Sequence, residues 1–243
     1  MPDILLIQPP IRDFYLTAKR TVPYGLAALA AAVRQAGFTV AILDGLASAK
    51  ARPAPLPWEM AHLNTYYGKP DVSPLALFHQ FRHFGRSIAH IGRQAGESGA
   101  FLVGIASLFT AYSQEALAAA RSVKSYLPGC RVVRGGHHPT ALPAESMACP
   151  AVDFVIRGEG ENALPQLARA LRSGGDLERV PGIVLRRPDG SLHLSPPAVV
   201  AELDDCPQPA RDLIDARFYR RRRRGSTVVV ASRGCQMTCS YCR

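Results

Sequence analysis

The chain has 243 residues, of which 47% are hydrophobic and 20% are charged, a composition typical of a folded globular protein. No apolar run approaches the roughly 18 residues that span a bilayer. The chain also lacks the basic start followed by an apolar stretch that is typical of an export signal. These observations argue against a collagen-like, disordered or membrane-spanning chain, and we expect a cytoplasmic protein. At roughly 150 residues per domain, the length predicts one domain and part of a second.

The formal net charge is +10, but the basic residues are unevenly placed. Nine of the 29 Lys and Arg residues lie after position 210, five of them in the run Arg220–Arg224. This run has no interleaved aromatic residues on which bases could stack. A local basic segment is more often a solvated face than a nucleic-acid surface, so we do not expect nucleic-acid binding.

The first predicted elements form a strand–helix–strand unit. Residues 3–7 are almost wholly apolar and are followed by two prolines, which predicts a strand buried on both faces. An Ala- and Leu-rich helix is predicted over residues 23–36, with Gly37 at its end, and a second strand over 38–43. Strands joined in this way pair in parallel.

The next region breaks this rhythm. Residues 48–76 show little periodicity and predict an irregular insertion. A helix is predicted over residues 77–91, because Leu77, Phe81, Phe84, Ile88 and Ile91 recur at steps of four and three. On such a helix His79, His83 and His90 would share the opposite face with arginines, which favours a solvated basic face over a metal site.

Three further strands complete the predicted sheet. They lie over residues 101–105, 131–134 and 153–156, with helices predicted over 115–126 and 162–171. Five strands alternating with helices indicate an α/β fold with a doubly wound, five-stranded parallel sheet of the flavodoxin-like or Rossmann-like type. We assign residues 1–172 to this domain.

The chain after residue 172 no longer alternates between predicted strands and helices. Residues 173–225 predict a small hairpin around Pro188-Asp189-Gly190 and then an extended linker, with a short helix over 212–219. Residues 227–231 are β-branched and predict a strand that leads into a cysteine-rich end. We assign residues 226–243 to the start of a second, incomplete domain.

The six cysteines fall into two groups. Cys130, Cys149 and Cys206 are scattered, as expected of buried or semi-buried thiols. The other three form a C-x3-C-x2-C pattern at Cys235, Cys239 and Cys242. In a chain without an export signal, clustered cysteines favour a metal or cluster over disulfides. A zinc site is the alternative, although zinc usually takes a fourth Cys or His, and none lies close in sequence.

Unusual residues follow several of the predicted strands. In open parallel sheets, ligands bind outside the carboxyl ends of the strands, where the strand order switches. The loops there hold Ser107, the pair Gly135-Gly136 and the sequence Gly158-Glu159-Gly160-Glu161. Each feature alone is weak, because glycines after strands are common turn residues. Together they predict a site where a large flat ligand approaches the backbone closely.

Two sets of motifs carry a resemblance. The first comprises Leu6-Ile7-Gln8-Pro9-Pro10, Pro23-Tyr24-Gly25-Leu26, Gly104–Phe109, Gly135–Thr140 and Arg157–Glu161. The second is the cysteine pattern with Tyr241 before its last cysteine. The first set, over about residues 2–172, resembles the cobalamin-binding domain of cobalamin-dependent radical SAM enzymes. The second resembles their CxxxCxΦC motif, and the two in this order are far more specific than either alone.

The resemblance implies three cofactors, namely cobalamin, a 4Fe-4S cluster and S-adenosyl-L-methionine. Three thiolates on one loop can hold three irons and leave the fourth open, and the resemblance places S-adenosylmethionine on that iron, with Tyr241 near the adenine. The implied metal ligands are Cys235, Cys239 and Cys242. The other residues implied in cofactor binding are Pro9, Pro10, Tyr24, Gly25, Ser107, Leu108, Gly135, Gly136, His137, Gly158, Glu159 and Gly160. No catalytic residue is implied in this chain.

The sequence departs from related patterns in the loop after the first strand. Some corrinoid-binding domains carry D-x-H-x-x-G there, whose histidine binds cobalt. Here Asp13 is followed by Phe14-Tyr15 and residues 8–23 contain no histidine, so we expect no axial ligand from this loop.

Three other positions leave their roles open. Aligning the family's S-x-L pattern on Leu108 puts Ala106 at the serine position. Whether Ser107 contacts the cofactor is therefore left as an open question. His137 and His138 fit exposed loop histidines as well as cofactor contacts. Glu159 and Glu161 are expected to orient a loop or cap a helix rather than act as acid and base.

A radical SAM barrel takes about 200 residues, and this chain has one residue after Cys242. We therefore expect a piece of a larger enzyme, inactive alone. The parent would be a methyltransferase that uses methylcobalamin and a 5′-deoxyadenosyl radical on an unactivated carbon, with a reducing partner of the flavodoxin or ferredoxin type. A radical SAM cyclase or other radical transformation stays open, as do a stand-alone corrinoid carrier or sensor and an interaction module that binds no corrinoid.

Overall fold

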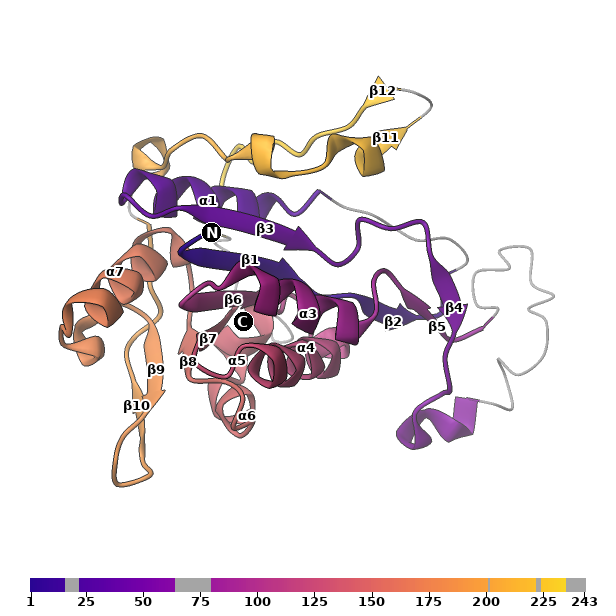
Figure 1. Ribbon diagram of the computed structural model, residues 1–243, viewed down its shortest axis with the longest axis horizontal. Helices are drawn as coiled ribbons and strands as arrows, with labels where there is room; N and C mark the ends of the chain where they lie inside the picture. Colours follow the sequence, from indigo (N-terminus) through magenta and orange to yellow (C-terminus); the bar gives the residue numbers. More distant parts are fainter. Residues whose placement is uncertain (16–21, 64–79, 201, 222–223, 235–243) are drawn as a thin grey trace.

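The computed structural model describes residues 1–15, 22–63, 80–200, 202–221 and 224–234. Its centre is a parallel sheet (Figure 1). The five parallel strands are β1 (Ile4–Gln8), β3 (Val40–Asp44), β6 (Leu102–Ala106), β7 (Arg131–Gly135) and β8 (Phe154–Ile156). They lie in the order β3-β1-β6-β7-β8, so the chain first moves to one side of β1 and then to the other.

Two antiparallel strands extend this sheet. β9 (Ile183–Arg186) pairs with β8, and β10 (Leu192–Leu194) pairs with β9, which makes a mixed sheet of seven strands. The prediction of an α/β fold with a mostly parallel sheet is confirmed. The predicted strand number of five was too low, because the hairpin around Pro188 pairs with the edge of the main sheet.

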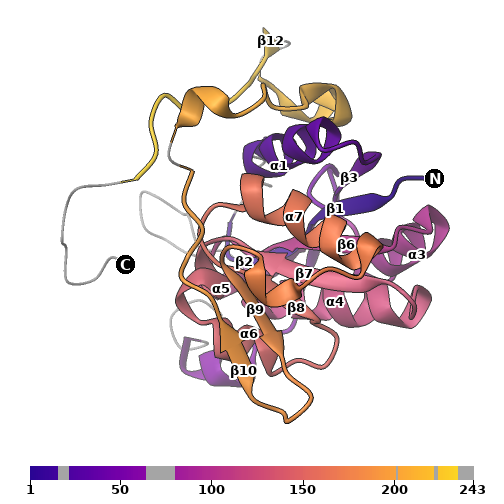
Figure 2. The same ribbon diagram turned by 90° about the vertical axis from the view of Figure 1, so that its left-hand side faces the viewer.

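Helices cover both faces of the sheet (Figure 2). α1 (Tyr24–Gln35) and α7 (Gly160–Ser173) lie on one face, and α3 (Ile88–Ser98) and α4 (Ser113–Tyr126) lie on the other. Alternate residues of β1 serve the two cores: Ile4 and Leu6 pack with α1 and α7, whereas Leu5 and Ile7 pack with α3 and α4. Two short helices, α5 (His137–Ala141) and α6 (Pro143–Met147), follow β7 and were not predicted. Among the described residues, no helix is long and apolar enough to cross a membrane.

The predicted helix over 77–91 is wrong over residues 80–87 and correct only for residues 88–91, which open α3. β5 (Arg82–Phe84) is a strand between β2 (Ile11–Asp13) and β4 (Ala51–Pro53), and these strands form a separate small sheet. Gly85 stops any helix there, since its φ is +106° and a Cβ would lie 2.3 Å from the Gly45 carbonyl oxygen. The helix starts only after Ser87, whose Oγ accepts a hydrogen bond from the His90 amide.

Two neighbouring predictions change with that helix. In the described part of the predicted irregular insertion at 48–76 there are two regular elements, β4 and a 3₁₀ helix, η1 (Trp58–Leu63). The predicted histidine face is wrong, because His83 lies on β5 and His90 on α3, while His79 is outside the described residues.

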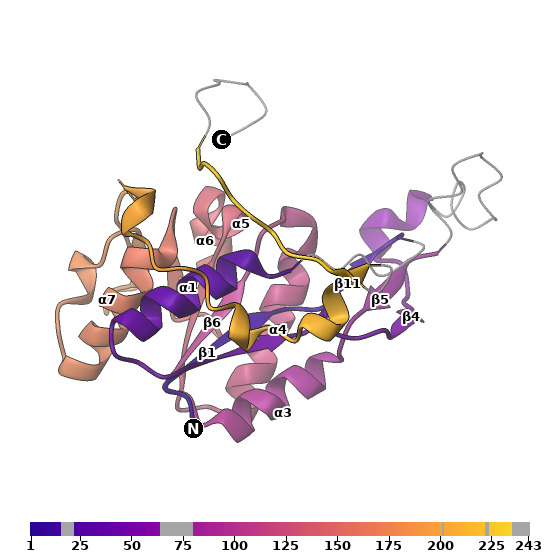
Figure 3. The ribbon, with the colours of Figure 1, turned by 90° about the horizontal axis from the view of Figure 1, so that it is seen from above.

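The chain after the hairpin lies across α1 (Figures 1 and 3). We call residues 202–221 and 224–234 the C-terminal strap. The Ala210 amide donates to the Ala27 carbonyl oxygen at 2.9 Å, and Arg34 forms a two-pronged pair with Asp212. The Tyr219 hydroxyl then donates to Asp44, beyond the opposite end of α1. These contacts bury α1 between the sheet and the strap.

The regular elements of the strap are mainly short 3₁₀ turns, joined by irregular chain. These elements are η4 (Leu203–Asp205), η5 (Arg211–Leu213), η6 (Ala216–Tyr219), β11 (Arg220–Arg221) and β12 (Arg224–Gly225). Another 3₁₀ turn, η3 (Leu177–Arg179), lies before the hairpin and outside the strap. The short helix predicted over 212–219 is therefore split into two 3₁₀ turns. The predicted strand over 227–231 is wrong, since these residues pair with no strand of the described chain and Val229 is 78% exposed. A strand needs a neighbour for its backbone hydrogen bonds.

Candidate functional site

The carboxyl ends of the parallel strands form one edge of the domain. Because β3 and β6 flank β1, the switch in strand order lies between β1 and β6. The structure brings most of the predicted residues to this edge. Pro9 and Pro10 follow β1, Ser107 and Leu108 follow β6, Gly135, Gly136 and His137 end or follow β7, Gly158, Glu159 and Gly160 follow β8, and Tyr24 and Gly25 open α1.

Gly135, the last residue of β7, and Gly136, the residue after it, have different structural roles. A Cβ on Gly135 would have a single neighbour within 4 Å, the Ile156 carbonyl oxygen at 3.9 Å, so the backbone there is open to a ligand. Gly136 has φ +119°, and a Cβ would lie 2.6 Å from the Ser107 carbonyl oxygen. Gly136 therefore permits the β6 and β7 loops to pack together, while Gly135 leaves room beside them.

The edge also presents apolar side chains to solvent. Leu108 is 46% exposed and Phe109 is 61% exposed on the loop after β6, and Leu142 is 42% exposed at the junction of α5 and α6. The Phe109 and Tyr112 rings pack edge to face with centroids 6.0 Å apart. Exposed apolar residues on adjacent loops, beside an open backbone position, suit a broad and largely apolar ligand surface.

A buried hydrogen-bond network supports this edge from below. Arg134 on β7 is fully buried, and its Nη2 donates to Ser107 Oγ at 2.8 Å and to Ser113 Oγ at 3.2 Å. Ser113 Oγ lies 2.8 Å from His138 Nε2, and His138 Nδ1 lies 3.2 Å from Thr110 Oγ1. The network joins β6, β7, α4 and α5 and fixes the loops that carry Leu108 and Gly135.

Burial changes the titration of two members of this network. Desolvation lowers the pKa of Arg134 to about 10, and Arg134 Nε and Nη1 have no hydrogen-bond partner among the described residues. Burial, and then the nearby Arg134 charge, lower the pKa of His138. His138 is therefore neutral at pH 7 and can accept a hydrogen bond from Ser113.

The loop after β1 is tied to the loop after β6. The Tyr112 hydroxyl donates to Asp13 Oδ2, and Arg12 Nε pairs with Glu115 Oε1 at 2.5 Å. Burial and the Asp13 carboxylate raise the pKa of Tyr112. Asp13 thus joins the two sides of the switch point. The sequence offers no histidine there, since residues 8–23 contain none.

At the other end of the edge, acidic residues hold the strap. Arg233 Nη2 lies 2.6 Å from Glu161 Oε1, and Arg233 Nη1 lies 3.5 Å from Glu159 Oε1. The Val200 amide donates to Glu159 Oε2 at 2.5 Å. Neither glutamate caps α7 through a side-chain hydrogen bond, so they orient the loop and the strap instead.

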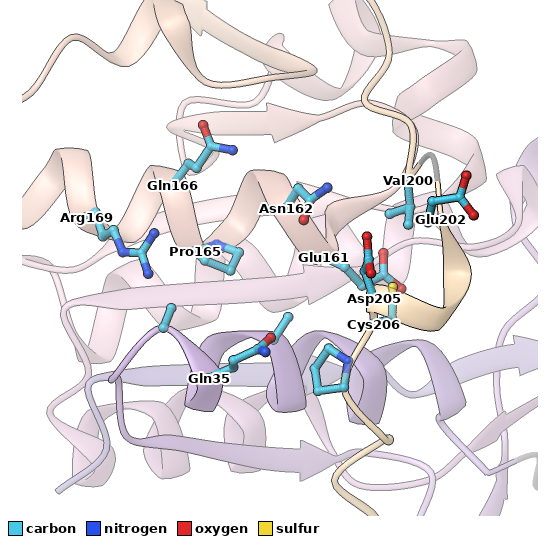
Figure 4. Close-up of a pocket in the computed structure, with 13 residues that line it drawn as sticks. Gln35, Glu161, Asn162, Pro165, Gln166, Arg169, Val200, Glu202, Asp205 and Cys206 are labelled. Atoms are coloured by element: carbon cyan, nitrogen blue, oxygen red, sulfur yellow. The ribbon is translucent and has the colours of Figure 1, made fainter.

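A cavity of about 350 Å³ lies between α1 and α7 beside these acids (Figure 4). Glu161, Asp205 and Cys206 gather at one end of it, and Arg169 lies at the other. Burial and the Glu161 charge raise the pKa of the Cys206 thiol. The cavity is polar and lies along the outer surface of the helices, apart from the switch point.

The predicted cluster ligands Cys235, Cys239 and Cys242, together with Tyr241, lie outside the described residues. The described cysteines are free thiols, and Cys130 and Cys149 are buried, as expected. Within the described chain, no group of three or more His, Cys, Asp or Glu side chains could hold a metal ion.

Sequence reasoning missed the residues that support the site. Arg134 was assigned only to a strand, although an arginine within the apolar run Val132-Val133-Arg134 signals a buried charge. His138 is 2% exposed and lies inside the network, whereas His137, the one included among the predicted contacts, is exposed. Arg233 gave no signal in sequence, because its partners lie over 70 residues away.

Comparisons with known proteins agree with this geometry. Residues 79–168 match the B12 binding domain. An uncharacterized methyltransferase of Pyrococcus horikoshii is 29% identical over 246 residues, which cover 98% of this chain and 44% of that protein. An anaerobic magnesium-protoporphyrin IX monomethyl ester cyclase of Synechocystis sp. is 33% identical over 122 residues, 49% of this chain and 24% of that protein.

A solved structure shares the fold. The cobalamin-dependent S-adenosylmethionine radical enzyme OxsB, with aqua-cobalamin and S-adenosylmethionine bound, superposes with a TM-score of 0.67 at 16% identity, over 100% of this chain and 28% of that one. Residues 79–168 are thus similar in sequence to the B12 binding domain, and the chain is similar over 98% of its length to an uncharacterized methyltransferase. It spans less than half the length of these relatives.

Proposed function

We propose that the described domain holds cobalamin at the carboxyl edge of its sheet for a radical SAM methyltransferase that acts on an unactivated carbon. The observation that carries this proposal is the open backbone at Gly135 beside the exposed Leu108 and Phe109, within the region that matches the B12 binding domain. A corrin ring is broad, flat and largely apolar, and it suits such a surface.

The chain's own residues would bind and orient the ring rather than react. Gly135 and Gly25 leave the backbone open, because a Cβ on Gly25 would meet no atom within 4 Å. Leu108 and Phe109 would cover apolar parts of the ligand, and the buried Arg134 network would keep their loop in place. Residues 8–23 contain no histidine, so this loop would offer the cofactor no imidazole ligand.

The cysteine pattern would supply the second part of the chemistry. Cys235, Cys239 and Cys242 have the spacing that holds three irons of a 4Fe-4S cluster, and Tyr241 would lie near bound S-adenosylmethionine. When bound, these cofactors would supply the methyl group and the 5′-deoxyadenosyl radical that removes hydrogen from the substrate. Substrate contacts would come from parts of the parent enzyme beyond this chain, and electrons from a flavodoxin- or ferredoxin-type partner.

A cyclase is the second candidate, because a relative that is named a cyclase matches about half of this chain. Both candidates use the same cobalamin edge, so the domain alone does not separate them. Product analysis of the full-length parent would separate the two candidates, since methyl transfer replaces a substrate hydrogen with a methyl group and cyclisation does not.

The test of cobalamin binding is a visible spectrum after incubation with hydroxocobalamin and desalting. We expect near-stoichiometric corrin absorbance with bands shifted toward the base-off form. Gly135→Leu should lose the corrin, because its side chain fills the open position. Gly129→Leu should retain it, because Gly129 lies before β7, at the other end of the strand, where a Cβ would meet no atom within 4 Å. Loss of all colour by the folded wild-type chain would overturn the proposal.

A further inference from the structure

The C-terminal strap begins and ends at the same place in the fold. The residues just before it are held by the loop after β8, where the Glu159 amide donates to the Ala198 carbonyl oxygen at 2.9 Å and Glu159 Oε2 accepts from Val200. Its last described residues return to the same carboxylate, because Glu159 Oε1 accepts from Arg233 Nη1. One glutamate therefore holds both ends of a segment that crosses α1 and turns back.

The second acidic residue of this loop is the more buried one. The Glu161 side chain is 8% exposed, and its partner Arg233 is 22% exposed. The Tyr24 hydroxyl, at the start of α1, also hydrogen-bonds with Arg233. The guanidinium thus contacts the first turns of both α1 and α7, the two helices that cover one face of the sheet.

The surroundings make this cation necessary. Glu202 and Asp205 line the same cavity as Glu161 (Figure 4), and Glu159 lies two residues before it. A largely buried carboxylate among other acids is costly unless a cation pairs with it. In the part of the chain that the structure describes, Arg233 is the cation that pairs with Glu161.

We propose that Glu159 and Glu161 form a docking site for Arg233, which fixes the chain that enters the cysteine motif at the carboxyl edge of the cobalamin domain. This inference rests on the proposed function for its purpose, since Cys235 follows Arg233 by two positions. Arg233 is accordingly a positioning residue. It sets where the cluster-binding segment leaves the domain, and Glu159, Glu161 and Tyr24 hold its guanidinium in place.

The first test is trypsin cleavage of the full chain without added cofactors. Cleavage after Arg233 requires its side chain to enter the protease, so the docked arginine should be cut slowly. Glu161→Gln keeps the shape and removes the charge, and we expect cleavage after Arg233 to rise about tenfold, or about 1.4 kcal/mol. The matched control is Glu178→Gln, which breaks the ion pair between Glu178 and Arg187 on the β9–β10 hairpin. It should leave the rate unchanged.

The second test separates a specific pair from general loosening. Urea unfolding of the full chain should show a lower free energy of unfolding in Glu161→Arg and in Arg233→Glu, and the double variant should recover much of the wild-type value. Arg233→Lys should recover part of it, because an ammonium can pair with one carboxylate at a time. Unchanged cleavage in Glu161→Gln, or no recovery in the exchanged pair, would overturn the docking site.

These outcomes are distinct from those of the proposed function. If the wild-type chain retains no corrin but Arg233 is protected, the docking site stands and the cobalamin proposal fails. If corrin is retained and Glu161→Gln does not change cleavage after Arg233, the docking site fails alone. Glu161→Gln should bind corrin like the wild type, because Glu161 lies beside the strap and not at Gly135.

Discussion

Two parts of the carboxyl edge are fixed by different means. Between β6 and β7, a buried network joins hydrogen-bonded partners that are 21 to 28 residues apart, namely Arg134, Ser107, Ser113, His138 and Thr110. Beside β8, ion pairs join Glu159 and Glu161 to an arginine 72 to 74 residues away. The first part is built within the sheet domain, and the second depends on the strap.

The difference separates holding a ligand from holding a neighbouring segment. A buried network of short sequence separation forms with the sheet and gives the open position at Gly135 a rigid floor. The ion pairs of Glu159 and Glu161 lie outside both apolar cores, so they hold the strap without being part of the packing of the sheet. The same edge thus carries a site built by the sheet domain and a site that holds the strap.

The largest expected effect is at Gly136, on which the packing of the β6 and β7 loops depends. Gly136→Ala should lower the free energy of unfolding by about 3 kcal/mol, because it combines a positive φ with a Cβ 2.6 Å from the Ser107 carbonyl oxygen. Gly135→Ala should cost less than about 1 kcal/mol. Urea unfolding of the two variants measures the contrast. Equal losses of unfolding free energy in the two variants would contradict the different structural roles assigned to Gly135 and Gly136.

A smaller effect is expected from Ser113, which bonds both Arg134 and His138. Ser113→Ala should cost about 2 kcal/mol of unfolding free energy, because buried His138 Nε2 loses its hydrogen-bond partner and Arg134 Nη2 keeps only its bond to Ser107. Ser173→Ala is the control, since that exposed hydroxyl bonds only the Arg169 carbonyl oxygen of its own helix, and it should change stability by less than about 0.5 kcal/mol. A Ser113 variant as stable as this control would contradict the network.

The smallest effect is a pH dependence from His138. Its pKa is lowered from the ordinary 6.5 by burial and by Arg134, while Glu145, 3.8 Å away, acts in the opposite direction. The unfolded chain therefore binds a proton at higher pH than the folded one. Stability is fully present above about pH 6.5 and falls as the pH drops toward the folded pKa. His138→Gln should show a shallower fall in urea midpoint between pH 7 and 5, and identical slopes would contradict this assignment.

Much of the central sheet could be predicted from sequence because its signals are local. Short apolar runs at β1, β6 and β7, alternating with helical segments, define a parallel sheet without knowledge of distant contacts. The gathering of Pro9, Ser107 and Gly135 on one edge then follows from the direction of parallel strands. What sequence could not supply was the pairing of the hairpin with β8, which depends on an edge left free by the rest of the fold.

The errors arose where tertiary contacts override periodicity. Residues 81–91 repeat at helical spacing, but Gly85 approaches the Gly45 backbone and β5 finds strand partners on both sides. Residues 227–231 have strand composition and no described strand to pair with. The assignments of Ser107 and Glu159 as cofactor contacts stay predictions. Their side chains are engaged with Arg134, Arg233 and Val200, none of which local sequence could reveal.

The position of α1 between the sheet and the strap has a consequence for biosynthesis. The pairs Arg34–Asp212 and Asp44–Tyr219 join residues 178 and 175 positions apart. A ribosome therefore completes α1 long before it makes the residues that cover it. The outer surface of this alanine-rich helix stays uncovered while most of the domain is translated, and a chaperone that shields it would act until the strap emerges.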